Sequence, residues 1–337
     1  MKNCLCVILV VCICVVIFPV QIGALESTVD VQIEKIEGIP WLSTMPISTT
    51  ITEVNKYYST TPNSLEWKSY VTSNEMIAAC RIDQKKLNSM TTEEVVDAVL
   101  CFPMLVDLYA YNEIDIALEQ LALKSDAYRE LRSRPDGAKC LQKALANIVN
   151  TPEKYHSAGV AMLSVSMLLS DSVFGGAEKN FMVGTTNAAR AYITTITTPG
   201  GSTVQVIYRG EELSAADVAR INNDLVTVYS NATLLAPATT VYNCHNFAWN
   251  TTARDAYWMN QTSAKVYMED GSYDESSTTA NAILYYGDSV DHSACVLQPN
   301  APSYPIVIAK WGYGPLMQHR ADYGPYSMNT GDYSYWS

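Results

Sequence analysis

The chain has few charged residues and no cluster of positive ones. Only 17% of its 337 residues are charged, and 22 Lys and Arg against 34 Asp and Glu give a net charge of −12. A protein that binds nucleic acid or an anionic membrane surface needs a basic patch, and this sequence contains no run of Lys or Arg. We therefore expect neither nucleic acid nor, once the N-terminal segment described below is removed, a membrane as a partner.

Common catalytic and cofactor motifs are also missing. The sequence has no Gly-x-Ser-x-Gly nucleophile turn and no His-Glu-x-x-His zinc motif, and Gly175-Gly176 lacks the Gly-Lys-Ser/Thr of a phosphate loop. We accordingly expect no cofactor and no metal. Only 5 Phe are present against 22 Tyr and 6 Trp, and such aromatic residues either line a groove for a polar ligand or, more commonly, form the core.

The N-terminus has the features of a secretory signal. Lys2 is followed by an apolar run from Leu5 to Val20 and then by the small residues Gly23 and Ala24. This order of charge, apolar segment and small residues predicts a signal over residues 1–24 that is cleaved after Ala24. An uncleaved anchor is the alternative, and in both cases the rest of the chain would lie outside the cytoplasm.

Four of the nine cysteines belong to the predicted signal, so the mature chain would keep five. An odd number in a secreted protein leaves at least one thiol unpaired within the chain, as a nucleophile requires. The five are Cys80, Cys101, Cys140, Cys244 and Cys295.

The remainder divides by pattern into three parts. Residues 25–72 are polar and lack periodicity, which predicts an extended lead-in. Residues 73–194 show helical periodicity, for example after the capping box of Thr91 and Glu94, and predict an all-helical domain. We expect helices over residues 91–102, 115–131, 137–149 and 160–169. Residues 195–337 mix helical segments with short strand patterns, at residues 283–286, 293–297 and 306–309, and this order predicts an α+β domain with an antiparallel meander.

The segment around Cys244 carries the candidate chemistry. If Asn243 caps a helix that begins at Cys244, the helix dipole and the free N–H groups favour a thiolate, and the pKa of the thiol should fall toward neutrality. A thiolate nucleophile also needs an imidazole, and His292 precedes a run that reads as a buried strand. His245 follows Cys244 directly and points about a hundred degrees away on a helix, so we expect it in the wall of the site or exposed.

These residues carry a family resemblance. The motif Asn-Cys-His-Asn-Phe-Ala-Trp, residues 243–249, followed by Asp-His-Ser-Ala, residues 291–294, resembles the Cys-to-His order of the CHAP-type and NlpC-type amidases. The resemblance covers about the last hundred residues and implies a small papain-like domain in which Cys244 is the nucleophile and His292 the base. It also implies peptide or amide bonds of the bacterial cell wall as substrate. The whole chain resembles secreted proteins of unassigned function from Gram-positive bacteria.

The residue that would orient His292 departs from the family pattern. If the predicted strands over residues 291–297 and 306–311 pair, His292 lies opposite roughly Lys310. A lysine cannot accept a hydrogen bond from an imidazole N–H. The acceptor would then be His319, which we favour, a backbone carbonyl, or the carboxylate of Asp288 or Asp291.

Three alternatives stay open. A disulfide between Cys244 and Cys295 would make the chain a non-catalytic secreted or surface binding module. A zinc site of Cys244, His245, His292 and Cys295 has a permissible spacing, but residues three apart on a strand point to opposite faces. Acyl or amide transfer would use the same residues as hydrolysis.

Overall fold

The structure is a computed structural model that describes residues 56–150, 158–174, 191–210, 213–299, 304–326 and 333–337. The predicted signal and the predicted lead-in up to residue 55 lie outside these ranges. Among the described residues, no helix combines the length and the apolar character that crossing a membrane requires. The chain combines helices with an antiparallel sheet, which confirms the mixed α and β class.

Short helices build the part of the chain before residue 175. Thr91 accepts the backbone N–H of Glu94, and the Glu94 carboxylate accepts that of Thr91, so the predicted capping box is confirmed. The elements are α2 (Leu65–Ser69), α3 (Ser73–Ala79), α4 (Gln84–Ser89), α5 (Thr92–Leu100), η2 (Leu105–Ala110), α6 (Ile114–Lys124), α7 (Asp126–Ser133), α8 (Gly137–Asn150), α9 (Ala158–Leu169) and η4 (Ser172–Phe174).

The single helix predicted over residues 115–131 is wrong, because the segment forms two. Ser125 has extended backbone angles, and its side chain accepts the N–H of Tyr128 as the N-cap of α7. A serine hydroxyl that binds the backbone in this way favours a new helix start over continuation. Helix α6 therefore ends at Lys124.

Within its described residues, the second part contains a hairpin, three helices and a seven-stranded antiparallel sheet of order β3-β8-β7-β6-β5-β9-β4. The predicted meander is confirmed over β5 to β7, where neighbours in sequence pair antiparallel, and β8 extends it by a strand that the sequence did not predict. The elements are β1 (Tyr192–Thr197), β2 (Thr203–Tyr208), α10 (Ala215–Val228), β3 (Thr233–Ala236), α11 (Cys244–Trp249), α12 (Gln261–Glu269), β4 (Glu275–Ser276), β5 (Ile283–Tyr285), β6 (Ser293–Gln298), β7 (Ile306–Lys310), β8 (Leu316–Arg320) and β9 (Ser334–Trp336).

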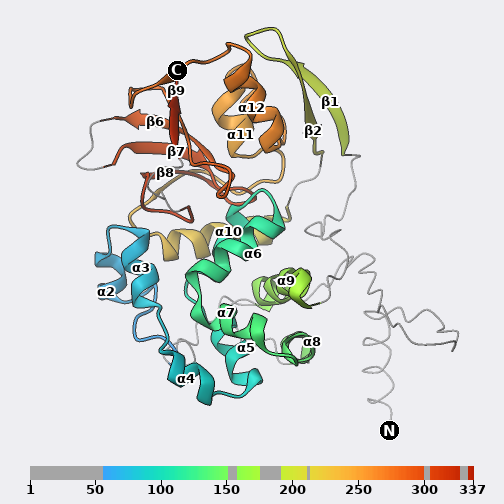
Figure 1. Cartoon of the computed structure of the whole chain (residues 1–337), viewed down its shortest axis with the longest axis vertical. Coiled ribbons are helices and arrows are strands. Elements are labelled where there is room, and N and C mark those ends of the chain that lie inside the picture. The colour runs from blue at the N-terminus through green and yellow to red at the C-terminus, as the bar shows by residue number, and fades with distance from the viewer. Residues whose placement is uncertain (1–55, 151–157, 175–190, 211–212, 300–303, 327–332) are drawn as a thin grey trace, which may run out of the picture.

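The sheet is covered on both faces, as alternation along β5 shows. Ile283 and Tyr285 pack with α11, α12 and β2, whereas Leu284 and Tyr286 belong to a larger core that also contains side chains of the N-terminal helices. In Figure 1 the helices α2 to α9 gather below the sheet, and α11 and α12 lie beside it. One core thus joins both parts of the chain, and the predicted domain boundary near residue 195 stays a prediction.

Gly312 lies where the turn after β7 meets the N-terminal helices. Its φ is 47°, and an added Cβ would lie 2.5 Å from the backbone of Ala110 and 2.8 Å from the Tyr111 carbonyl. Gly201 also has a positive φ, 94°, but its Cβ would meet nothing within 4 Å. Both Ala substitutions strain the backbone, but only Gly312→Ala adds a steric overlap.

We therefore expect Gly312→Ala to lower the free energy of unfolding by roughly 1–3 kcal/mol more than Gly201→Ala, measured by urea denaturation. Equal losses in the two variants would contradict this close approach.

Candidate functional site

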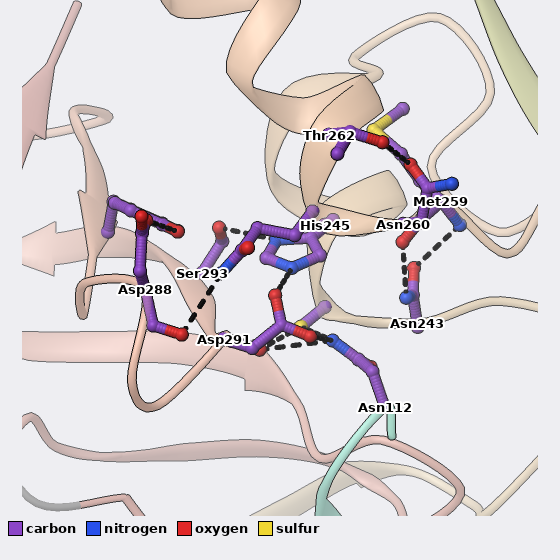
Figure 2. A network of polar contacts seen from close by, with 12 residues as sticks. Asn112, Asn243, His245, Met259, Asn260, Thr262, Asp288, Asp291 and Ser293 are labelled. Atoms are coloured by element: carbon purple, nitrogen blue, oxygen red, sulfur yellow. Dashed lines mark hydrogen bonds and ion pairs between the residues drawn. The ribbon is translucent and has the colours of Figure 1, made fainter. Parts of the chain in front are cut away.

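Helix α11 begins at Cys244 and is capped as the sequence predicted. Asn243 accepts the N–H of Asn246 at 3.2 Å and that of Met259 at 3.1 Å, and it donates to the Met259 carbonyl at 2.7 Å. The Asn243 side chain thus ties the start of the helix to residue 259, which Figure 2 shows. Because α11 packs against β6 and β7, this cap places the thiol at one end of the sheet.

The thiol of Cys244 is buried and protonated. Its residue is 1% exposed, and its sulfur lies 3.2 Å from the amide nitrogen of Asn112 and 3.9 Å from the Asp291 carbonyl oxygen. Burial, with the nearby Asp291 charge, raises the pKa of this thiol to about 12, although Asn112 and the backbone N–H groups of Ser293 and His245 oppose the rise. The expectation of a pKa near neutrality is wrong, because desolvation outweighs the helix terminus.

His245 is the centre of a buried polar network. Its Nε2 lies 2.8 Å from Asp291 Oδ1 and its Nδ1 lies 2.9 Å from Ser293 Oγ, as Figure 2 shows. The indole N–H of Trp249 also donates to Ser293 Oγ, at 2.9 Å, which leaves the serine proton for His245 Nδ1. The alternative that His245 is exposed is wrong, since the residue is fully buried. Both ring nitrogens are engaged, so His245 has none left for the thiol.

Asp291 holds this network together. Beyond its contact with His245, its Oδ2 accepts from Asn112 at 3.4 Å and its carbonyl accepts from the same amide at 3.1 Å. Burial opposes ionisation, but the contacts with His245 and Asn112 lower the pKa of the carboxyl. Its φ of 52° places it in the left-handed region, a conformation that aspartate tolerates better than most residues.

His292 is buried without a hydrogen bond. Its ring stacks on that of Tyr326, with centroids 3.4 Å apart and planes 9° apart, and it lies 5.0 Å from the ring of Tyr286. Neither ring nitrogen has a hydrogen-bond partner among the residues that the structure describes. Burial, with the two other histidines nearby, holds the pKa of His292 well below its usual range, so the ring is neutral.

The structure brings Cys244 to the backbone around His292 but not to its imidazole. Alternation along β6 places Ser293 on the α11 side, and His292 on the side of Tyr326. The sulfur contacts the backbone of residues 291 and 293, which flank His292. The ring of Tyr326 covers His292, and burial, with Cys244 nearby, raises the pKa of the Tyr326 hydroxyl, so Tyr326 lies close to both groups.

His319 does not orient His292. Its Nε2 accepts from the Trp311 indole at 3.1 Å, and its Nδ1 donates to the Arg320 carbonyl at 2.8 Å. Both ring nitrogens of His319 are thus engaged, so it offers no hydrogen-bond acceptor to the imidazole of His292. The prediction that His319 orients His292 is wrong. Lys310 donates to the carbonyls of Thr239, Gly312 and Gly314 and joins the loop before Cys244 to the β7–β8 turn.

The disulfide and zinc alternatives find no support in the geometry. All five described cysteines are free, and Cys295 accepts a hydrogen bond from Arg254 at 3.1 Å. Within the described ranges, no group of three or more His, Cys, Asp or Glu could hold a metal ion.

The sequence did not point to Asn112 or Tyr326. Asn112 lies 132 positions before Cys244 in a loop that the sequence assigned to a separate helical domain. Tyr326 is one of 22 tyrosines, with no pattern to distinguish it. For His245, the signal available in the sequence was its position next to Cys244. Its partner Asp291 lies 46 positions further along the chain.

Acid should destabilise the protein through His319. Burial lowers the pKa of His319 to about 4, whereas an unfolded histidine titrates near 6.5. Between these values the unfolded chain binds more protons, so the unfolding free energy falls as the pH drops from 6.5 to 4.

For His319 this loss is about 3 kcal/mol, and His292 adds to it in the same direction. We expect His319→Gln, which keeps an acceptor for Trp311, to flatten the pH profile of urea unfolding over this window. Parallel profiles for the two proteins would contradict the assignment.

Comparison with known proteins gives this site no relative. No family model matches the chain, and neither the curated proteins nor the solved structures contain a match.

Proposed function

We propose that the protein is a secreted or cell-surface thiol hydrolase that cleaves peptide or amide bonds, with Cys244 as nucleophile and His292 as general acid and base. The resemblance of residues 243–249 and 291–294 to cell-wall amidases makes bacterial cell-envelope peptides the proposed substrate. The proposed fold of the C-terminal part is papain-like, and the packing of α11 against β6 and β7 supports it.

The unpaired imidazole of His292 carries the proposal. Proteins rarely bury a polar side chain without a hydrogen bond, because the lost hydration costs about 1–3 kcal/mol per group. Both nitrogens of His292 lack a described partner, and its backbone neighbours contact the Cys244 sulfur. A neutral imidazole with no hydrogen-bond partner among the described residues can accept the proton of the thiol once a change of conformation brings the two groups within hydrogen-bond reach.

The chemistry follows from the groups around the sulfur. His292 takes the thiol proton, the thiolate attacks the carbonyl carbon, and the electron pair of the C=O bond moves to oxygen. The Asn112 amide and the N–H groups of His245 and Ser293, which already face the sulfur, are donors for that oxyanion. The leaving nitrogen takes the proton from His292 as the thioester forms. Water, deprotonated by His292, then releases the acid and restores the thiol.

The proposal requires a closed and an open state. Cys244 and His292 are both buried, and the ring of Tyr326 occupies the face of the imidazole. Displacement of Tyr326 would admit a substrate and let His292 turn toward the thiol. Tyr326 is held by the Ala110 carbonyl, which accepts its hydroxyl proton, and by Pro325, whose carbonyl accepts from Tyr111 and Lys124.

The pair of His245 and Asp291 has a positioning role in this scheme. It fixes the loop whose backbone flanks His292, and Asp291 also holds Asn112 against the sulfur. Asp291 is one of the acceptors that the sequence left open for His292. In this scheme it orients its own loop and the Asn112 amide instead of the imidazole of His292.

A non-catalytic binding module is the second candidate. The observation that favours it is the thiol itself, whose pKa of about 12 makes Cys244 inert in the closed state. The two candidates differ in whether Cys244 is needed for turnover.

The test is the release of new amino groups from purified Gram-positive peptidoglycan by wild type, Cys244→Ala and Cys80→Ala. Cys80, at the end of α3, is an equally buried free thiol, so its variant controls for the loss of a buried sulfur. We expect Cys244→Ala to lose roughly a thousandfold or more of the rate and Cys80→Ala to keep it when folded. Equal rates in wild type and Cys244→Ala would favour the second candidate.

A further inference from the structure

Arg209, just after β2, has no carboxylate or carbonyl acceptor among the residues that the structure describes. Its NH1 contacts the hydroxyl of Tyr313 at 3.4 Å, and its Nε is buried without a hydrogen-bond partner. Arg254 binds the Phe247 carbonyl and Cys295. Carboxylates pair with the other described arginines, which are Arg81, Arg129, Arg132, Arg134, Arg220 and Arg320.

Two aromatic rings hold the guanidinium in place. Its carbon lies 4.1 Å from the ring centroid of Trp258 and 5.6 Å from that of Tyr313, and the two rings lie 4.7 Å apart. Trp258 is fixed by a pair of 2.9 Å backbone hydrogen bonds with Ile207. A guanidinium stacked in this way presents its N–H groups in a fixed plane, the arrangement that binds a planar anion through two hydrogen bonds.

We propose that Arg209, Trp258 and Tyr313 form a binding site for a carboxylate, that of a peptide with a free C-terminus. A single positive charge on a chain of net charge −12 suits a monovalent planar anion better than a polyanion. The aromatic rings provide apolar walls for the chain that bears the carboxylate.

The site adjoins the Cys244 region through shared supports. Met259, which follows Trp258, is the residue that Asn243 binds, and the N–H of Tyr313 donates to the Tyr109 carbonyl at 2.8 Å, three residues before Asn112. A peptide bound at Arg209 would therefore extend toward the thiol. This extension rests on the proposed function, whereas the carboxylate site itself does not.

The test follows the Nε–Hε signals of arginine side chains by NMR while N-acetyl-L-alanine, its neutral amide analogue or inorganic phosphate is added. Arg209→Lys assigns the Arg209 signal, and Arg254, which also lies over an aromatic ring, serves as internal control. We expect a saturable shift of the Arg209 signal with N-acetyl-L-alanine alone, and roughly tenfold weaker binding to Arg209→Lys in calorimetry.

A shift with the amide analogue, an equal shift of Arg254, tighter binding of phosphate or no saturable shift would each overturn the proposal. The same titration on Cys244→Ala should give the wild-type result. Because no turnover is involved, failure of the carboxylate site and failure of the hydrolase remain distinguishable.

Discussion

Tyr326→Ala should raise the rate at which iodoacetamide alkylates Cys244 by more than about tenfold, since about 1.4 kcal/mol in the opening equilibrium suffices for that change. The ring of Tyr326 covers the imidazole of His292 next to a thiol that is 1% exposed. Its removal opens the path to both groups. Peptide mapping by mass spectrometry measures the rate for each cysteine.

The control must separate local opening from loss of stability. Replacing a large buried aromatic residue by Ala costs about 3–5 kcal/mol wherever it lies. Tyr323→Ala removes another buried tyrosine of the same segment, one that packs on Tyr229 instead of His292. Buried Cys80 reports global unfolding, because its alkylation requires the helical part to open. If Tyr323→Ala accelerates Cys244 equally, or if Cys80 follows Cys244, Tyr326 is not a specific cover.

Asp291→Ala should lower the free energy of unfolding by about 3–5 kcal/mol, because it removes the buried carboxylate that accepts hydrogen bonds from His245 and Asn112 and leaves both buried donors without it. The substitution leaves His245 Nε2 and the Asn112 amide without the carboxylate and puts Ala at a φ of 52°. Urea denaturation at pH 7 measures the loss.

Asp288→Ala is the matched control, since that carboxylate lies three residues earlier and was an equal candidate by sequence. It is 63% exposed and pairs with Lys265 at the surface, so its removal should cost at most about 1 kcal/mol. Similar losses in the two variants would show that the network around His245 does not stabilise this loop.

The sequence predicted those features that short segments determine. The capping box at Thr91, the helix start at Cys244 with its Asn243 cap, and the meander of β5 to β7 all depend on neighbouring residues and on local periodicity. Ser125 shows the limit of periodicity, because one hydroxyl that caps α7 divides an otherwise continuous helical pattern.

Neighbouring residues and local periodicity did not predict the surroundings of the site residues. Whether a thiol at a helix start titrates low or high depends on its burial, and the Cys244 thiol is buried by residues from three distant segments. The partners of His319 and Lys310 are likewise set by how β7 and β8 turn. The paired strand positions were predictable, but the hydrogen bonds that satisfy each side chain were not.

The most direct measurement of the central claim is the mass of the Cys244 peptide after brief treatment of the protein with p-nitrophenyl acetate and quenching in acid. If Cys244 is a nucleophile served by His292, an acetyl group appears on this peptide in wild type and Tyr326→Ala, faster in the latter, and is nearly absent in His292→Gln. A Cys244 peptide that stays unmodified in Tyr326→Ala, or is acetylated equally in His292→Gln, would contradict the account.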